Sequence, residues 1–190
     1  MTPELRLIAH PAATYAALAS TPVRIGRVAM FRRPLVAAVV LGCAVAMAGT
    51  RHVTPLLVLS TTTCWLVLIA SQVVIALGVF ARAAERTVGV PRAVDLFFAS
   101  HVPWSLWMLA AVAWAPTPGG RPLTPVLLAA LLPMVLTPRM IAAFCRQVLR
   151  MDGRQAIART AMHQVLTWGL FVAVYGSAVA LWPRIVQWLQ

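Results

Sequence analysis

Long apolar runs alternate with short polar connections along most of the chain. A helix needs about 20 apolar residues to cross about 30 Å of hydrocarbon. The strict alternation of a membrane β-barrel strand is missing, and lipid leaves no partner for unpaired backbone groups. The pattern therefore predicts an all-α, polytopic integral membrane protein whose domain covers residues 34–190. Its five transmembrane helices are expected at about 34–50, 55–80, 95–115, 124–144 and 163–182.

Residues 1–33 form a basic leader ahead of the first apolar run. The segment 11–19 is predicted to be a short helix in the headgroup layer, with Tyr15 and Leu18 turned toward lipid. The alternative is a weakly ordered tail.

The positive charges divide the connections into two groups. All sixteen basic residues are arginines, and thirteen of them lie in the leader and in the second and fourth connections. These thirteen are Arg6, Arg24, Arg27, Arg32, Arg33, Arg82, Arg86, Arg92, Arg139, Arg146, Arg150, Arg154 and Arg159. Only Arg51, Arg121 and Arg184 fall on the other side. The positive-inside rule therefore predicts a cytoplasmic N-terminus and a C-terminus outside.

Composition limits the class of protein and its partners. With 61% hydrophobic and 11% charged residues, the chain differs from a soluble domain, in which about a quarter of residues are charged. The net charge of +12 has no folded polar surface on which to bind nucleic acid, so anionic lipids are the expected partners. The absence of lysine beside abundant alanine and proline is typical of GC-rich bacteria and favours a bacterial inner membrane.

Small residues recur at four-residue spacing in two of the predicted spans. The first span carries Ala38, Gly42 and Ala46, and the fifth carries Gly169, Ala173 and Ser177. Such stripes let helix backbones approach closely within a membrane. They are predicted to pack inside the protein, and a dimer interface is the alternative.

Two polar side chains fall within the second apolar run. Thr61 and Gln72 lie along one face of the predicted helix. Polar groups at this depth face a neighbouring helix or a cavity. Hydrogen bonding between helices and a polar conduit for a solute are the two interpretations.

The fourth apolar run carries the candidate binding site. A helix that ended before Pro138 would be only about 20 Å long, so it must continue past this proline. Arg139, Arg146 and Arg150 would then share one helical face and could grip the phosphate of a lipid headgroup or an acidic partner. In the alternative interpretation, Arg139 reaches to the interface and the other two only satisfy the positive-inside rule.

Two histidines are the candidates for a metal or haem. His101 and His163 begin their predicted spans at comparable depth, and two facing histidines can ligate a haem iron. Interfacial histidines need no ligand, and no cofactor is predicted. The sequence contains no catalytic motif, so no enzyme activity is predicted.

Two stretches resemble the bacterial branch of the Yip family, which comprises Rab-interacting membrane proteins with five helices. The first is the leader segment Leu7-Ile8-Ala9-His10-Pro11-Ala12-Ala13-Thr14-Tyr15, with its His-Pro pair and following aromatic. The second contains Gly78-Val79-Phe80, Arg86-Thr87, Pro91, Phe98-Ala99 and Pro103. The resemblance implies five helices, and the eukaryotic relatives are associated with vesicle trafficking.

These observations lead to three hypotheses of function. The first is a non-enzymatic scaffold or accessory subunit that binds partner proteins or anionic lipids through a basic cytoplasmic face. The second is a small transporter or lipid-translocating protein with a polar cavity that reaches Gln72 and Arg139. The third is a haem-bearing electron-transfer subunit that uses His101 and His163.

Overall fold

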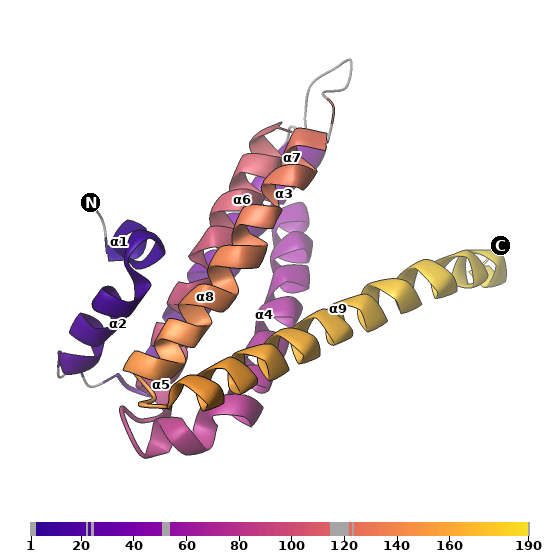
Figure 1. Cartoon of the computed structure of the whole chain (residues 1–190). Coiled ribbons are helices and arrows are strands. Elements are labelled where there is room, and N and C mark those ends of the chain that lie inside the picture. The colour runs from indigo at the N-terminus through magenta and orange to yellow at the C-terminus, as the bar shows by residue number, and fades with distance from the viewer. Residues whose placement is uncertain are drawn as a thin grey trace.

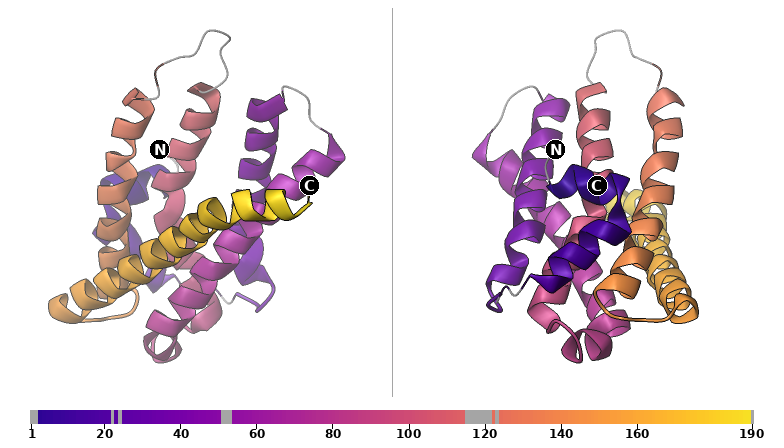
Figure 2. Two further views of the ribbon diagram at one scale, coloured as in Figure 1. Left: turned by 90° about the vertical axis from the view of Figure 1, so that its right-hand side faces the viewer. Right: turned by 60° about the vertical axis from the view of Figure 1, so that its left-hand side comes forward.

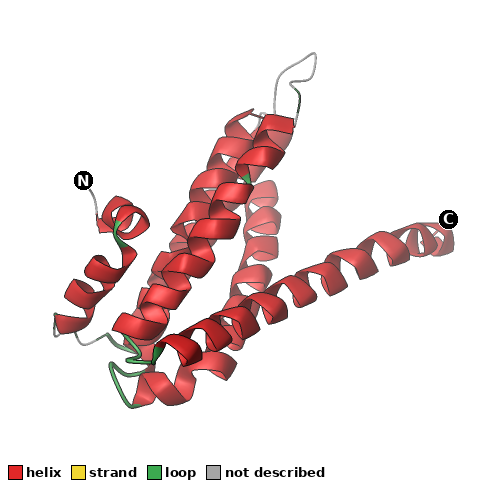
Figure 3. Cartoon of the chain, in the orientation of Figure 1, coloured by secondary structure: helices red, strands yellow, loops and turns green. Residues whose placement is uncertain are grey.

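The structure, a computed structural model, describes residues 3–189 apart from 22, 24, 51–53, 115–121 and 123, and all its regular elements there are helices (Figure 3). The predicted all-α class is confirmed for these residues. The elements are α1 Pro3–Ala9, α2 Pro11–Ser20, η1 Ala29–Phe31, α3 Arg32–Thr50, α4 Pro55–Glu85, α5 Val90–Phe98, η2 Ala99–His101, α6 Val102–Trp114, α7 Thr124–Ala129, α8 Leu131–Gln147 and α9 Gly153–Leu189.

Four helical segments are long and apolar enough to cross a membrane, which indicates an integral membrane protein. They run over Ala29–Met47, Pro55–Glu85, Val90–Trp114 and Thr124–Gln147. Figure 1 shows α3, α4, α6 and α8 gathered in one bundle, in which α3 packs on α4 and α6, and α6 packs on α8. Four of the five predicted spans therefore correspond to helices of sufficient length and hydropathy.

The last helix, α9, departs from the bundle. It begins at Gly153 rather than near His163, because the Asp152 carboxylate caps it by accepting the amide of Gln155 at 2.8 Å. Its first half packs against α4 and α8, and its second half extends away from them (Figures 1 and 2). The small residues Gly169, Ala173 and Ser177 are all exposed. Internal packing was therefore the wrong prediction for this stripe.

The fourth span continues through its two interior prolines, Pro133 and Pro138. Thr124 to Gln147 is helical except for a turn at Ala130, and Pro138 lies inside α8. A proline removes one backbone donor from a helix without necessarily ending it, and the chain needs the extra turns to reach the far side. The prediction that the helix continues past Pro138 is confirmed.

The small residues of α3 make its closest helix contact. Ala38, Gly42 and Ala46 are buried, and a Cβ atom added at Gly42 would lie only 2.8 Å from the Cα of Thr62 on α4. The hydroxyl of Thr61 donates to the Gly42 carbonyl at 2.9 Å. Internal packing is confirmed for this stripe, and Thr61 is part of the helix contact.

The described part of the leader packs on the bundle, chiefly through the contact of α2 with α8. Tyr15 is 0% exposed, its ring contacts that of Phe144 edge-on at 5.8 Å, and its hydroxyl donates to the Leu96 carbonyl at 3.2 Å. The prediction that Tyr15 faces lipid is wrong. An aromatic ring with one polar atom can be buried in a protein core when that atom finds a partner there.

One end of the bundle gathers the arginine-rich connections. The link from the leader to α3, the turn after α4 and the connection from α8 to α9 all lie at this end (Figures 1 and 2). Their exposed cations include Arg27, Arg32, Arg86, Arg150 and Arg154. We call this side of the molecule the arginine-rich end.

A methyl group at Gly42 should disturb the contact between α3 and α4. Since the atoms it would meet include backbone of α4, Gly42→Ala should lower the free energy of unfolding by about 1–3 kcal/mol. Gly169→Ala is the matched control, because its Cβ would meet nothing within 4 Å. Reversible unfolding in mixed detergent micelles measures both, and equal stability of the two variants would contradict the close contact.

Candidate functional site

A cavity of about 510 Å³ lies between the leader and α8. Alanines and Pro11 form much of its wall, and its polar lining residues are His10, Arg139, Arg146 and Gln147. Small side chains at the facing positions leave this space open between the two helices. We call it the α2–α8 cavity.

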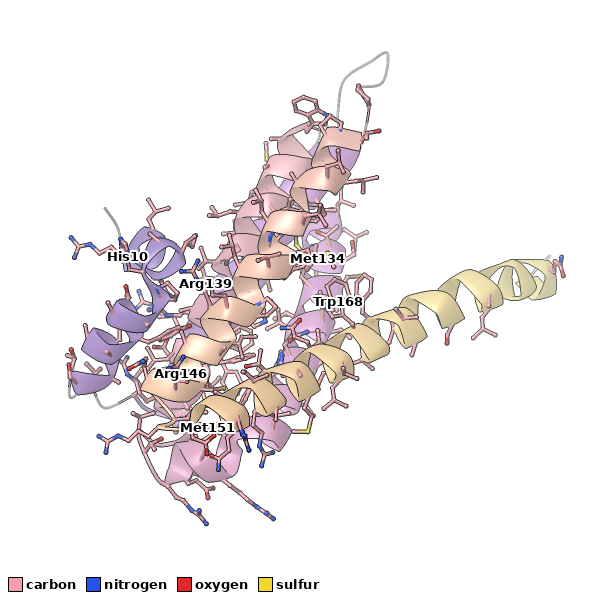
Figure 4. All side chains as sticks on the ribbon, viewed as in Figure 1. His10, Met134, Arg139, Arg146, Met151 and Trp168 are labelled. Carbon is pink, nitrogen blue, oxygen red and sulfur yellow. The ribbon has the colours of Figure 1, made fainter. Side chains whose placement is uncertain are left out.

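The two arginines project from the same face of α8. Arg139 and Arg146 are seven residues apart, close to two full helical turns, and both are exposed. Figure 4 labels them on α8, with His10 on the leader across from them. No acidic residue lines the cavity, and both ion pairs recorded among the described residues involve Asp95 instead. The site is therefore positively charged.

The start of α2 adds partial positive charge to the same cavity. Pro11 occupies the first turn of this ten-residue helix, and Ala12 and Ala13 line the cavity beside it. Amides of a first helical turn have no intrahelical partner, and the helix dipole favours an anion near them. This effect adds to that of the arginines.

Arg150 does not belong to the predicted stripe, and this part of the prediction is wrong. α8 ends at Gln147, and Arg150 lies beyond it in the left-handed region with φ 53°. The turn of the chain carries Arg150 away from the α2–α8 cavity to the surface between α4 and α9. Helical spacing applies only within a helix, so the stripe retains Arg139 and Arg146 alone.

A buried carboxylate, whose role the sequence analysis missed, holds the leader in place. Asp95 is 7% exposed and pairs with Arg33 at 2.9 Å and with Arg92 at 3.3 Å. Arg92 also donates to the Leu18 carbonyl near the end of α2 at 3.2 Å. These contacts join the leader, α3 and α5. They fix α2 against the bundle and so maintain one wall of the cavity.

Gln72 takes part in a contact between helices. Its side-chain oxygen accepts a hydrogen bond from the hydroxyl of Thr167 on α9 at 3.3 Å. Neither Gln72 nor Thr61 lines the α2–α8 cavity, to which Arg139 belongs.

The two candidate histidines lie together in the aromatic core. Their ring centroids are 6.4 Å apart, and His163 is 1% exposed and stacks on Phe80 at 5.8 Å. The Phe97 ring meets the His101 ring at 4.9 Å and the His163 ring at 5.0 Å. An axial haem pair needs a slot for the macrocycle between the rings, and in this structure the Phe97 ring packs against both of them.

Comparison of the chain with protein-family models, with curated proteins and with solved structures finds no match. The resemblance to the Yip family therefore stays a prediction.

The burial of Tyr15 should make the protein sensitive to alkali. Burial raises the pKa of its phenol far above the ordinary value, and the charge of Arg33 partly offsets this. The folded state thus favours the neutral phenol, so its contribution to stability is complete below about pH 10 and falls as the pH rises further.

Tyr15→Phe tests this contribution. The variant should be less stable by about 1 kcal/mol at pH 7, because it loses the hydrogen bond to Leu96. Above about pH 10 the difference should shrink, since phenylalanine has no proton to lose. Unfolding of the two proteins in detergent across this pH range measures it. A difference that stays constant with pH would show that Tyr15 ionises as easily folded as unfolded.

Proposed function

We propose that this protein is a non-enzymatic membrane scaffold or accessory subunit that binds the phosphate of an anionic lipid headgroup in the α2–α8 cavity. The observation that carries the proposal is the pair of exposed arginines, Arg139 and Arg146, on one face of α8 and within one cavity. That face has no acidic lining residue to neutralise it.

The chemistry of the lining suits a phosphate. A guanidinium group presents several N–H donors in one plane and binds phosphate oxygens in pairs. The volume of about 510 Å³ falls in the range of small-molecule sites, so it suits a headgroup while the acyl chains stay in the bilayer. The first-turn amides of α2 supply further donors for the same anion.

The orientation supports the same proposal. The arginine-rich end faces the cytoplasm by the positive-inside rule, α9 forms the fifth span, and the C-terminus lies outside. The inner leaflet of a bacterial inner membrane is rich in anionic lipid headgroups, which attract basic residues close to its surface. The same face is available to partner proteins.

The other two hypotheses have no comparable support. A transporter requires a polar path, and the side chain of Gln72 is instead bonded to Thr167. An electron-transfer subunit requires a cofactor site, and the rings of His101 and His163 are packed against Phe97. The lipid site remains the function that the geometry favours.

Removing the two cavity arginines should weaken lipid binding. Arg139→Ala combined with Arg146→Ala should reduce the affinity for phosphatidylglycerol at least tenfold, because each charge-assisted hydrogen bond contributes about 1.5–3 kcal/mol. The control pairs Arg27→Ala with Arg154→Ala, which removes the same charge from exposed positions outside the cavity. Titration of the full chain in detergent with phosphatidylglycerol in mixed micelles measures both. Equal losses in the two double variants would reject a defined site.

Cysteine labelling tests the orientation. In a chain without its native cysteines, a cysteine at Gly153 should be protected from an impermeant reagent, since this exposed position lies at the arginine-rich end. A cysteine at Gly119, which lies outside the described residues, should react. Labelling of intact cells with the reverse pattern would overturn the cytoplasmic assignment.

A further inference from the structure

A second and larger basic cavity lies between the end of α4 and the start of α9. Its volume is about 870 Å³. Four arginines line it: Arg82 from α4, Arg86 directly after α4, Arg150 from the connection after α8, and Arg159 from α9. We call it the α4–α9 cavity. Segments far apart in the sequence thus bring four cations to one space.

The charge of this cavity is not neutralised by its own lining. No acidic residue lines it, and the four arginines take no part in the ion pairs recorded among the described residues. The nearest carboxylates along the chain are those of Glu85, which is exposed on α4, and Asp152, which caps α9. Four guanidinium groups facing one space repel each other, and a ligand with several negative charges would relieve this repulsion.

The floor of the cavity is apolar and open. Gly78 and Arg82 are four residues apart and share one face of α4, and Arg86 follows directly after the end of this helix. Leu77 and Val79 also line this part, and a Cβ atom added at Gly78 would meet nothing within 4 Å. The Val79 carbonyl accepts a hydrogen bond from Arg159 at 3.3 Å. The cavity therefore combines arginines with apolar lining residues, as an amphiphilic ligand requires.

The backbone conformation at Arg150 supports a binding role for this residue. Its φ of 53° lies in the left-handed region, which glycine adopts without strain and a residue with a Cβ atom does not. The turn itself is made by backbone hydrogen bonds from Met151 to Cys145 at 3.0 Å and from Leu149 to Phe144 at 3.2 Å. Glycine would serve this turn better, so the arginine has no role in making it. Strained residues of this kind cluster at binding sites.

We propose that the α4–α9 cavity binds a membrane lipid that carries two phosphate groups. The phosphates lie among the four arginines, and the glycerol or alkyl stem passes over Gly78 toward the bilayer. The inference rests on the proposed function only in placing the arginine-rich end in the headgroup layer. The α4–α9 cavity differs from the α2–α8 cavity in its number of arginines. Two arginines suit a ligand with one phosphate, and four arginines suit a ligand with two.

The first test compares ligands that differ in the number of phosphates. The full chain in detergent is titrated with cardiolipin, with twice the molar amount of phosphatidylglycerol, and with inorganic pyrophosphate, and native mass spectrometry counts the bound molecules. Cardiolipin should bind at least tenfold more tightly than either of the others. Equal binding of phosphatidylglycerol would reject the requirement for two phosphates. Equal binding of pyrophosphate would reject the lipid and indicate a soluble ligand.

Two variants separate binding from folding. Arg150→Gly should lower the affinity for cardiolipin about tenfold and leave the protein as stable as before or more stable, since it removes the strain at φ 53°. Gly78→Leu keeps every charge, fills the open floor, and should also weaken binding. Arg154→Ala, which lies outside the cavity, is the charge-matched control for Arg150→Gly. Unchanged affinity in both test variants, or an equal loss in the control, would overturn the proposal.

The same titration distinguishes the two cavities. The paired substitutions Arg139→Ala and Arg146→Ala should leave the preference for cardiolipin over phosphatidylglycerol unchanged, because both residues line only the α2–α8 cavity. If that pair abolished the preference and Arg150→Gly did not, the two-phosphate site would be misplaced while the proposed function survived. If Arg150→Gly alone abolished it, the second site would stand by itself.

Discussion

The buried carboxylate of Asp95 is the interaction on which the arrangement of this protein depends. It accepts ion pairs from Arg33 at the start of α3 and from Arg92 on its own helix, and Arg92 also reaches the leader. Burying a carboxylate costs free energy unless cations or hydrogen-bond donors pair with it. The buried Asp95 side chain therefore stabilises the arrangement in which the leader, α3 and α5 lie together. The leader can therefore be held against the bundle rather than lie free in the headgroup layer.

The position of the leader produces the first cavity, and the end of α8 produces the second. Tyr15 and Leu7 anchor the leader in the core, and alanines on the facing sides leave the α2–α8 cavity open. On the other side, the chain turns sharply after Gln147 and carries Arg150 toward α4. Arg146 of the first cavity and Arg150 of the second both lie toward the arginine-rich end, so headgroups of one leaflet can reach both proposed sites.

Below this end, aromatic packing makes the bundle compact. The rings of Phe80, Phe97 and Phe144 contact each other at centroid distances of 5.7–6.1 Å, and His163 stacks among them. The far half of α9 extends away from the bundle and exposes apolar side chains such as Val172 and Val174. In the proposed topology lipid covers these side chains, so the protein core is concentrated at the arginine-rich end.

The sequence by itself determined the helices, the apolar spans and the grouping of the arginines, because these follow from local composition and from the length needed to cross a bilayer. The continuation of α8 past Pro138 followed from that length alone. Tertiary structure decided which arginines meet. Arg150 left the predicted stripe because the helix ended one residue after Arg146, and helical periodicity has no meaning beyond that point. Tyr15 entered the core because its partners, Phe144 and the Leu96 carbonyl, come from segments that only folding brings together.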